Sequence, residues 1–188
     1  MKIIAGKYKK QQIISQESKT TRPILTRIRE NLFNILNNYF YYENKVALDL
    51  FAGSGSIGIE ALSRDIKFCY FNDYDKNSLN YLQKNLQKLK VDSNNYTITN
   101  LDFLQCLNRL KIQQNQLDLV FLNPPYKHIN YYHEAVSFLI KHKLLNNYGI
   151  IICETNRVLD IKNSEIELLT MRKYGKIFLY FYRYEERK

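Results

Sequence analysis

The stretch Val46-Ala47-Leu48-Asp49-Leu50-Phe51-Ala52-Gly53-Ser54-Gly55-Ser56-Ile57-Gly58 decides the fold class of this 188-residue chain. An apolar run ends in a glycine-rich window, and a helical pattern begins directly after it. Three of the six glycines in the chain fall within this window, which matches the spacing G-x-G-x-x-G. A strand, a tight turn and a helix in this order predict an α/β domain that binds a ligand at the carboxyl end of the strand.

The remainder of the core repeats this alternation of strands and helices. We predict strands over 46–51, 68–72, 96–99, 117–122 and 149–154, and helices over 56–64, 76–89, 103–110 and 131–144. Two further strands, 165–171 and 176–183, follow one another with no helix between them. The alternation predicts a mostly parallel seven-stranded sheet with helices on both faces, and the final pair predicts an antiparallel C-terminal edge.

The N-terminal residues precede this alternation and form a small extension. Short strands over 2–5 and 11–15 predict a β-hairpin around a lysine-rich turn. Pro23 disfavours a helix at the residue before it, and apolar side chains then recur at helical spacing over 26–41. We therefore expect a single domain that consists of an extension, 1–42, and a core, 43–188.

Length and composition limit the class of protein. A content of 45% hydrophobic residues suits one globular domain with its own core. No run is apolar for long enough to span a bilayer or to act as a signal peptide, so we expect a cytoplasmic monomer without a membrane partner. The three cysteines and three histidines show no ligand spacing, which predicts buried thiols and no metal site.

The positive charge of the chain is concentrated near its N-terminus. The formal net charge is +10, and residues 1–36 contain eight Lys or Arg against two Glu. Such clustering predicts contact with the phosphates of a nucleic acid. A solvated basic surface is the alternative, because lysine is abundant throughout the chain.

The acidic neighbours of the glycine-rich window indicate the cofactor. Asp73 follows Gly53 by 20 residues, which is the spacing of a dinucleotide site. A nicotinamide oxidoreductase is therefore an alternative function. Asp49 argues against that cofactor, because its carboxylate would repel a pyrophosphate at the helix N-terminus. S-adenosylmethionine (SAM) instead presents a sulfonium cation and an amino group, and an acidic neighbour suits both. We therefore expect SAM.

Two further aspartates each have two interpretations. Asp73 either accepts hydrogen bonds from the ribose hydroxyls or caps a helix, and Asp75 is the better cap because it directly precedes the helical pattern. Asp102 either accepts from the adenine amino group, with Phe103 packed near the ring, or caps the helix that follows. The local sequence does not decide between the two roles of Asp102.

The strongest signal for chemistry is Asn123-Pro124-Pro125-Tyr126, which holds two of the three prolines and follows a predicted strand. Consecutive prolines make a rigid bend and remove two amide donors, so carbonyl oxygens remain for a substrate. The Asn123 side chain and the Pro124 carbonyl can each accept one proton of an amino group and turn its lone pair toward a methyl donor. Tyr126 offers a face on which an unstacked base packs. The motif predicts methyl transfer to the amino group of a base, and a structural proline turn is the alternative.

These residues resemble SAM-dependent methyltransferases that carry the motif [D/N]-P-P-[F/Y/W] and methylate exocyclic amines of adenine or guanine. Further segments are similar to the bacterial 16S ribosomal RNA guanine-N2 methyltransferase family, namely 1–8, Arg22-Pro23, 27–34, 49–55 and 173–176. The resemblance covers essentially the whole chain. It implies the Rossmann-like fold of class I methyltransferases, SAM as cofactor, and N2-methylation of one guanine of small-subunit rRNA during ribosome assembly.

The resemblance also implies roles for individual residues. The cofactor site would comprise Asp49, Phe51, Gly53, Gly55, Asp73, Asp102, Phe103 and Asn123. The base would be held by Asn123, Pro124, Pro125 and Tyr126, and ribosomal RNA or the assembling small subunit would be contacted by Lys7, Lys9, Arg22, Pro23, Arg27 and Arg29. The family often has aspartate at the position of Asn123. Because an amide cannot act as a base, we expect the proton to leave to solvent after transfer.

Three other functions are compatible with parts of the sequence. A DNA adenine-N6 methyltransferase would use the same proline motif, but the chain has no separate region for recognising a DNA target. A nicotinamide oxidoreductase fits the glycines but neither Asp49 nor the prolines. A non-catalytic RNA-binding assembly factor fits the charge but does not explain an intact Asn123 and glycine loop.

Overall fold

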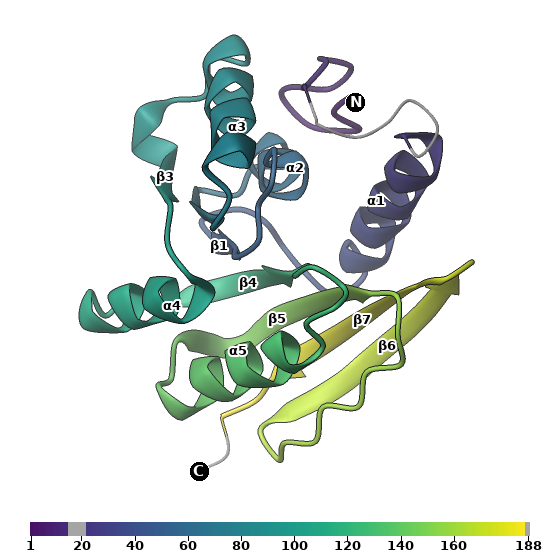
Figure 1. The fold of residues 1–188 in the computed structure, drawn as a ribbon, viewed down its shortest axis with the longest axis vertical. Helices are drawn as coiled ribbons and strands as arrows, with labels where there is room; N and C mark the ends of the chain where they lie inside the picture. Colours follow the sequence, from purple (N-terminus) through teal and green to yellow (C-terminus); the bar gives the residue numbers. More distant parts are fainter. Residues whose placement is uncertain (15–21, 187–188) are drawn as a thin grey trace.

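The computed structural model describes residues 1–14 and 22–186, and in this part of the chain seven strands form one sheet (Figure 1). The strand order is β3-β2-β1-β4-β5-β7-β6. Strands β1 to β5 pair in parallel, whereas β7 is antiparallel to both β5 and β6. The predicted parallel sheet with an antiparallel C-terminal edge is confirmed. The bounds are β1 Val46–Asp49, β2 Phe68–Asn72, β3 Tyr96–Thr99, β4 Leu117–Leu122, β5 Leu145–Thr155, β6 Ile166–Tyr174 and β7 Ile177–Tyr184.

Helices cover both faces of the sheet, as predicted. Two separate apolar clusters show which helix lies on which face: α1, α2 and α3 pack on one, and α4 and α5 on the other. Neighbouring residues of a strand alternate between the clusters, so that Ala47 belongs to the first and Leu48 to the second. The bounds are α1 Arg22–Leu36, α2 Ser56–Ser63, α3 Lys76–Lys88, α4 Phe103–Ile112 and α5 Asn130–Lys141, with a short 3-10 turn η1 at Ser93–Asn95.

The strand order brings distant segments of the sequence together at one edge of the sheet. The five parallel strands all point the same way, so their carboxyl ends share that edge. The connection reverses direction between β1 and β4, which are neighbours in the sheet. Ligands of open α/β sheets bind at such a reversal. The glycine-rich loop after β1 and the proline motif after β4 therefore meet there.

The N-terminal segment folds back as predicted, but its pairing is shorter than the predicted strands. Residues 1–3 and 10–13 pair antiparallel around a bridge between Lys2 and Gln12, and the Ile3 N–H donates to the Gln11 carbonyl at 2.9 Å. No regular strands form over residues 2–5 and 11–14, and residue 15 of the predicted second strand lies outside the described residues. The backbone N–H groups of Ile4 and Ala5 donate instead to the Glu60 carboxylate in α2, at 2.8 and 3.0 Å. The chain turns back over residues 5–10, which keeps the pairing short, and the two bonds to Glu60 join the segment to α2. The segment consequently packs against the core.

Helix α1 begins earlier and ends earlier than predicted. It includes Pro23, because proline is tolerated in the first turn, where its missing N–H has no intrahelical partner. It ends at Leu36, and the Tyr39 side chain that appeared to continue the apolar stripe is 42% exposed. Among the helices of the described residues, none has the length and apolar character needed to cross a membrane.

Candidate active site

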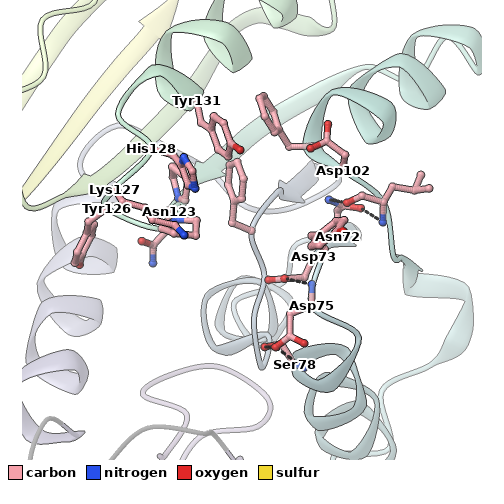
Figure 2. A pocket seen from close by; sticks show the side chains of 16 residues that line it. Asn72, Asp73, Asp75, Ser78, Asp102, Asn123, Tyr126, Lys127, His128 and Tyr131 are labelled. Carbon is pink, nitrogen blue, oxygen red and sulfur yellow. Dashed lines mark hydrogen bonds between the residues drawn. The ribbon is translucent and has the colours of Figure 1, made fainter.

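A cavity of about 680 Å³ lies at the carboxyl edge of the sheet (Figure 2). Its walls come from the segments after β1, β2, β3 and β4 and from the start of α5. In Figure 2 the carboxylates of Asp73 and Asp102 lie on one side of the cavity, and Asn123 and Tyr126 lie on the other. The structure thus brings the predicted ribose and adenine ligands together with the proline motif.

The glycine-rich loop is shaped by close contacts that only glycine permits. Gly55 caps α2 in the left-handed conformation, with φ of 81°. A Cβ atom at Gly58 would lie 2.3 Å from the ring of Phe71 in β2. The start of α2 can therefore approach β2 closely, and the loop stays tight against the sheet. Neither Gly53 nor Gly55 is among the residues that line the cavity.

Asp49 lies behind this loop and not on the cavity wall. It is 2% exposed, and its Oδ2 accepts a hydrogen bond from the Gly58 N–H at 2.9 Å. Burial, with smaller contributions from the nearby charges of Asp73 and Glu154, raises the pKa of Asp49 to about 7, and the Gly58 bond opposes the shift. A nearby cation would favour the ionised carboxylate. Asp49 can thus act on a cofactor through its charge and through its hold on the loop.

Asp73 faces the cavity with both carboxylate oxygens already oriented. Oδ2 accepts from the Gly53 N–H at 2.7 Å, and Oδ1 accepts from the Asp75 N–H at 2.8 Å. Asp75, and not Asp73, caps α3 by accepting from the backbone of Asn77 and Ser78. The better cap candidate was therefore identified correctly. Asp73 remains available to accept the hydroxyls of a ribose, since each oxygen has a second lone pair.

Of the two roles considered for Asp102, the helix cap is confirmed, and the contact with adenine stays a prediction. Its Oδ1 accepts from the Leu104 N–H at 2.9 Å and so caps α4, and the residue also lines the cavity. Asn72, which the sequence analysis missed, holds in place the backbone segments beside Asp102. Its side chain donates to the carbonyls of Leu50 and Leu101 and thereby ties the ends of two segments together. Only the fold could reveal this role, because the two carbonyls are far apart in sequence.

A wall of aromatic rings closes one side of the cavity. Phe103, which was predicted, packs at a centroid distance of 5.6 Å from Phe51 and 4.5 Å from Tyr131. The His128 ring stacks on Tyr131 at 4.5 Å with an interplanar angle of 6°. Such a wall can pack against the flat ring of a cofactor or base. Tyr131 and His128 were missed, although both follow the proline motif within five residues.

The proline motif presents acceptors to the cavity, with one correction. The Pro125 carbonyl is not free for a substrate, because it accepts from the His128 N–H at 2.9 Å. Asn123 is half-buried, and within the described residues neither its side chain nor the Pro124 carbonyl has a hydrogen-bond partner. The Tyr126 hydroxyl donates to Glu154 at 3.3 Å, and burial together with that carboxylate raises the pKa of Tyr126. Asn123 and Pro124 are therefore the acceptors that can receive an amine.

The predicted RNA-contacting residues fall into three groups. Lys7, Lys9 and Arg27 are exposed, as such contacts require. Arg22 and Pro23 begin α1, and their side chains lie outside the described residues. The prediction for Arg29 is wrong: it is 3% exposed, and its guanidinium donates to the Met1 sulfur and the Lys2 carbonyl. It holds the N-terminal segment on α1.

The remaining reactive side chains lie away from this site. Cys69, Cys106 and Cys153 are all buried, as predicted, and burial raises the pKa of each thiol. Buried thiols of raised pKa are poor nucleophiles. Within residues 1–14 and 22–186, no group of three or more His, Cys, Asp or Glu side chains could hold a metal ion.

Comparisons with known proteins agree with this site. The family model described as conserved hypothetical protein 95 matches residues 1–183. A Haemophilus influenzae protein named Ribosomal RNA small subunit methyltransferase D is 40% identical over 162 residues, which cover 84% of this chain and 79% of that protein.

Solved structures extend the likeness to the fold. A Haemophilus influenzae protein provisionally named a methylase is 33% identical over 98% of both chains, with a TM-score of 0.78. An Escherichia coli protein provisionally named a methyltransferase is 26% identical, with a TM-score of 0.83. The match covers 100% of this chain and 99% of that chain. The predicted Rossmann-like methyltransferase fold is confirmed. The chain belongs to the family described as conserved hypothetical protein 95, which confirms its resemblance to bacterial small-subunit rRNA methyltransferases.

Proposed function

We propose that this protein transfers the methyl group of SAM to the exocyclic N2 amine of a guanine in small-subunit ribosomal RNA. One observation carries the proposal: Asp73, a carboxylate suited to a ribose, and Asn123, an amide suited to an amine, line the same cavity. The family supports the choice of substrate, because a 40% identical relative is named for the small-subunit RNA.

The cofactor end of the cavity offers groups that fit SAM. Asp73 and Asp102 are acceptors for the ribose hydroxyls and the adenine amine, and Phe51 and Phe103 form an apolar wall beside them. When bound, SAM supplies a methyl group activated by a sulfonium cation. The carboxylate of Asp49 favours that cation and disfavours a pyrophosphate, which supports SAM over a dinucleotide.

At the acceptor end, Asn123 and the Pro124 carbonyl receive the two protons of the base amine. These bonds hold the nitrogen with its lone pair toward the methyl group and offset the positive charge that develops during transfer. Tyr126 stacks on the base, and its bond to Glu154 fixes the ring in place. An asparagine cannot accept a proton as a base, so the proton leaves to solvent after transfer.

Exposed cations of the N-terminal region contact the phosphates of the RNA. Lys7 and Lys9 lie in the segment that packs on α2, and Arg27 lies on α1. Phosphate contacts of this kind fix the orientation of the RNA without reading its sequence. The buried Arg29 supports this surface from within.

The test of the substrate is a map of modified bases in cells that contain or lack this protein. We expect N2-methylguanine to disappear from one position of small-subunit rRNA and to return on re-expression. An unchanged rRNA map contradicts the proposal. Loss of N6-methyladenine from DNA would instead identify a DNA adenine methyltransferase.

The cofactor is tested by calorimetric titration of the protein with SAM and with NAD. We expect saturable binding of SAM and no heat from NAD at the same concentrations. Binding of NAD alone would favour the oxidoreductase and contradict the methyltransferase.

Substitution of the amide tests the acceptor site. Asn123→Ala should lower the rate of methyl transfer about 100- to 1,000-fold, the cost of removing one preorganised hydrogen bond to a developing charge. The dissociation constant of SAM should stay within about threefold of the wild-type value, because Asn123 is at the base end. The matched control is Asn108→Ala on the exposed side of α4, which should leave the rate unchanged. Full activity of Asn123→Ala would refute the assigned role.

A further inference from the structure

The turn between β6 and β7 is a basic segment to which the function proposed above gives no role. It has the sequence Lys173-Tyr174-Gly175-Lys176. Tyr174 pairs with Ile177, so Gly175 and Lys176 are the two central residues of a tight hairpin turn. Gly175 has φ of 60°, a value that glycine adopts readily and other residues rarely adopt. The turn therefore presents its two lysines on a short and well-defined backbone.

The register of the sheet places this turn at the edge where the proline motif lies. Strand β7 is antiparallel to β5, and Phe178 near the start of β7 pairs with Thr155 at the end of β5. Since β5 is parallel to β4, the turn lies beyond the carboxyl ends of both strands (Figure 1). The strand spacing of about 4.8 Å puts β7 roughly 10 Å from β4, a distance that about three nucleotides of a stacked strand cover. The turn is therefore within reach of nucleotides that flank a base held at Asn123.

The two ends of the β6–β7 hairpin differ in charge. At the end away from the cavity, the Arg183 guanidinium forms ion pairs with Glu167 and Glu185 at 2.7 and 2.9 Å. At the turn, Lys173 and Lys176 are exposed, and neither forms an ion pair with any described residue. The positive charge at the turn is thus available to a partner that carries negative charge.

A third exposed cation lies on the neighbouring loop. Arg157 follows Thr155 by two residues, and its backbone N–H donates to the Thr155 Oγ1 at 3.2 Å. Its guanidinium forms no ion pair within residues 1–14 and 22–186. The Lys173 ammonium lies 5.2 Å from the ring centroid of Phe178, the residue that pairs with Thr155. We call Arg157, Lys173 and Lys176 the hairpin-turn cations.

The hairpin-turn cations and the N-terminal lysines lie on opposite sides of the proline motif. Lys7 and Lys9 belong to the segment that is joined to α2, and α2 contacts β1 and β2. The hairpin turn connects β6 with β7. In the strand order, β4 and the motif that follows it stand between the two groups. An RNA strand runs away from its target base in two directions, so its phosphates can meet both groups.

We propose that the hairpin-turn cations bind RNA phosphates on one flank of the target nucleotide, while Lys7 and Lys9 bind phosphates on the other flank. The inference rests on the proposed function, since it requires that the base end of the cavity receive a nucleotide of RNA. Removal of a base from its stack costs free energy, and phosphate contacts on both flanks offset this cost and position the base. Such contacts carry no sequence information, so they do not select guanine.

The test measures the binding of an rRNA fragment by fluorescence anisotropy over a salt series. The fragment spans the position that the rRNA map identifies. The hairpin-turn variant replaces all three hairpin-turn cations with alanine. The control variant replaces three exposed lysines that precede the amino ends of β2, β4 and β5, namely Lys67, Lys111 and Lys141. Binding of SAM within about threefold of wild type shows that each variant is folded, since surface substitutions away from a site change free energies little.

We expect the hairpin-turn variant to bind the fragment about 10- to 100-fold more weakly than the wild type. The slope of log K against log salt should decrease by about 0.7 for each lost phosphate contact, or about 2 for three contacts. The value of kcat at saturating RNA should stay within about twofold of wild type, because the reacting groups are unchanged. The control variant should keep the wild-type slope.

Truncated fragments locate the contacts. Removal of the nucleotides on one flank should weaken binding by the wild type but not by the hairpin-turn variant, which has already lost those contacts. Removal of the other flank should weaken binding by both proteins alike. Lys7→Ala combined with Lys9→Ala should show the reverse pattern. If both variants are insensitive to the same flank, the proposed arrangement on two flanks is overturned.

The remaining outcomes separate this inference from the proposed function. A wild-type salt slope in the hairpin-turn variant overturns the inference, while methylation of guanine leaves the proposed function standing. If the variant binds the fragment normally but fails to methylate small-subunit particles, the turn contacts a protein, and the inference is again overturned. If the rRNA map shows no lost N2-methylguanine, there is no target nucleotide to flank, and the inference fails together with the proposed function.

Discussion

Two regions of this protein each bury a carboxylate, but the charges beside the two carboxylates are of opposite sign. Under the N-terminal segment, Glu60 is fully buried and accepts from two backbone N–H groups of that segment and from Arg64 at 2.9 Å. Behind the glycine-rich loop, Asp49 is 2% exposed and accepts from the Gly58 N–H. The first carboxylate has a cation beside it, and the second has the like charges of Asp73 and Glu154.

The difference shows how to tell a structural carboxylate from a functional one. Glu60 has enough partners to offset its burial, and they join the N-terminal segment to α2. Burial raises the pKa of Asp49 to about 7, so the native fold maintains a carboxylate whose ionised form is costly. Perturbed groups of this kind gather at functional sites, where a ligand supplies the missing charge. A sulfonium cation at the cofactor end would do so.

The largest effect on stability should come from Glu60→Ala. This change leaves the Arg64 guanidinium and two backbone donors buried without their acceptor, so the free energy of unfolding should fall by about 3–5 kcal/mol. Urea unfolding followed by circular dichroism measures the change. Glu30→Ala, at an exposed position of α1, should cost no more than about 0.5 kcal/mol. If Glu60→Ala were as stable as wild type, the structural role of this carboxylate would be refuted.

Asp49→Asn should show the reverse pattern, with a loss of binding and not of stability. An asparagine oxygen still accepts from Gly58, but the negative charge that favours the cofactor is lost. We expect the affinity for SAM to fall about 10- to 100-fold, the range of a hydrogen bond to a charged group, and the free energy of unfolding at pH 8 to rise. Calorimetry and urea unfolding give the two quantities. Asp65→Asn on the surface should change neither, and unaltered SAM affinity in Asp49→Asn would show that Asp49 is only structural.

The pH dependence of SAM binding should follow the raised pKa of Asp49. The group is mostly ionised above pH 7 and mostly protonated below it, and the cation favours the ionised form, so affinity is full at high pH and falls as pH decreases through about 7. Between pH 8 and pH 6 the dissociation constant should increase about tenfold. The stability of the free protein should change in the opposite sense, since an ionised Asp49 is destabilising when no cation is near. A dissociation constant that is equally flat in the wild type and in Asp49→Asn would contradict this assignment.

The smallest effect should come from the exposed cations of the N-terminal region. Lys7→Ala combined with Lys9→Ala should weaken RNA binding several-fold and reduce the slope of log K against log salt by about 0.7 for each lost phosphate contact. Fluorescence anisotropy over a salt series measures both quantities. Lys111→Ala combined with Lys141→Ala, on the helices of the opposite face, removes the same charge and should leave the slope unchanged. Equal slopes in the two double variants would show that the N-terminal cations form a solvated surface and do not contact RNA phosphates.

Local patterns were sufficient for the elements and for the motifs at their ends. The alternation of apolar runs predicted the seven strands, and the position of Asp75 before a helical run predicted its cap. Patterns failed where a distant residue competes for a backbone group. The N-terminal hairpin is one example: its pairing is shorter than predicted, and Ile4 and Ala5 donate to the distant Glu60 and not to a partner strand. Arg29 is another, because the sequence reports its charge but not the segment that covers it.

The sequence by itself determined the fold class, the glycine-rich loop and the proline motif, because strand and helix periodicity and the rigidity of proline are local properties. Tertiary structure alone decided that β1 lies beside β4, so that loop and motif share one cavity. It also decided which charged groups are buried, and hence the contrast between Glu60 and Asp49. The ionisation of a carboxylate depends on its solvent and on the charges around it. Some of those neighbours come from segments more than 50 residues away, as the bond from Ile4 to Glu60 shows.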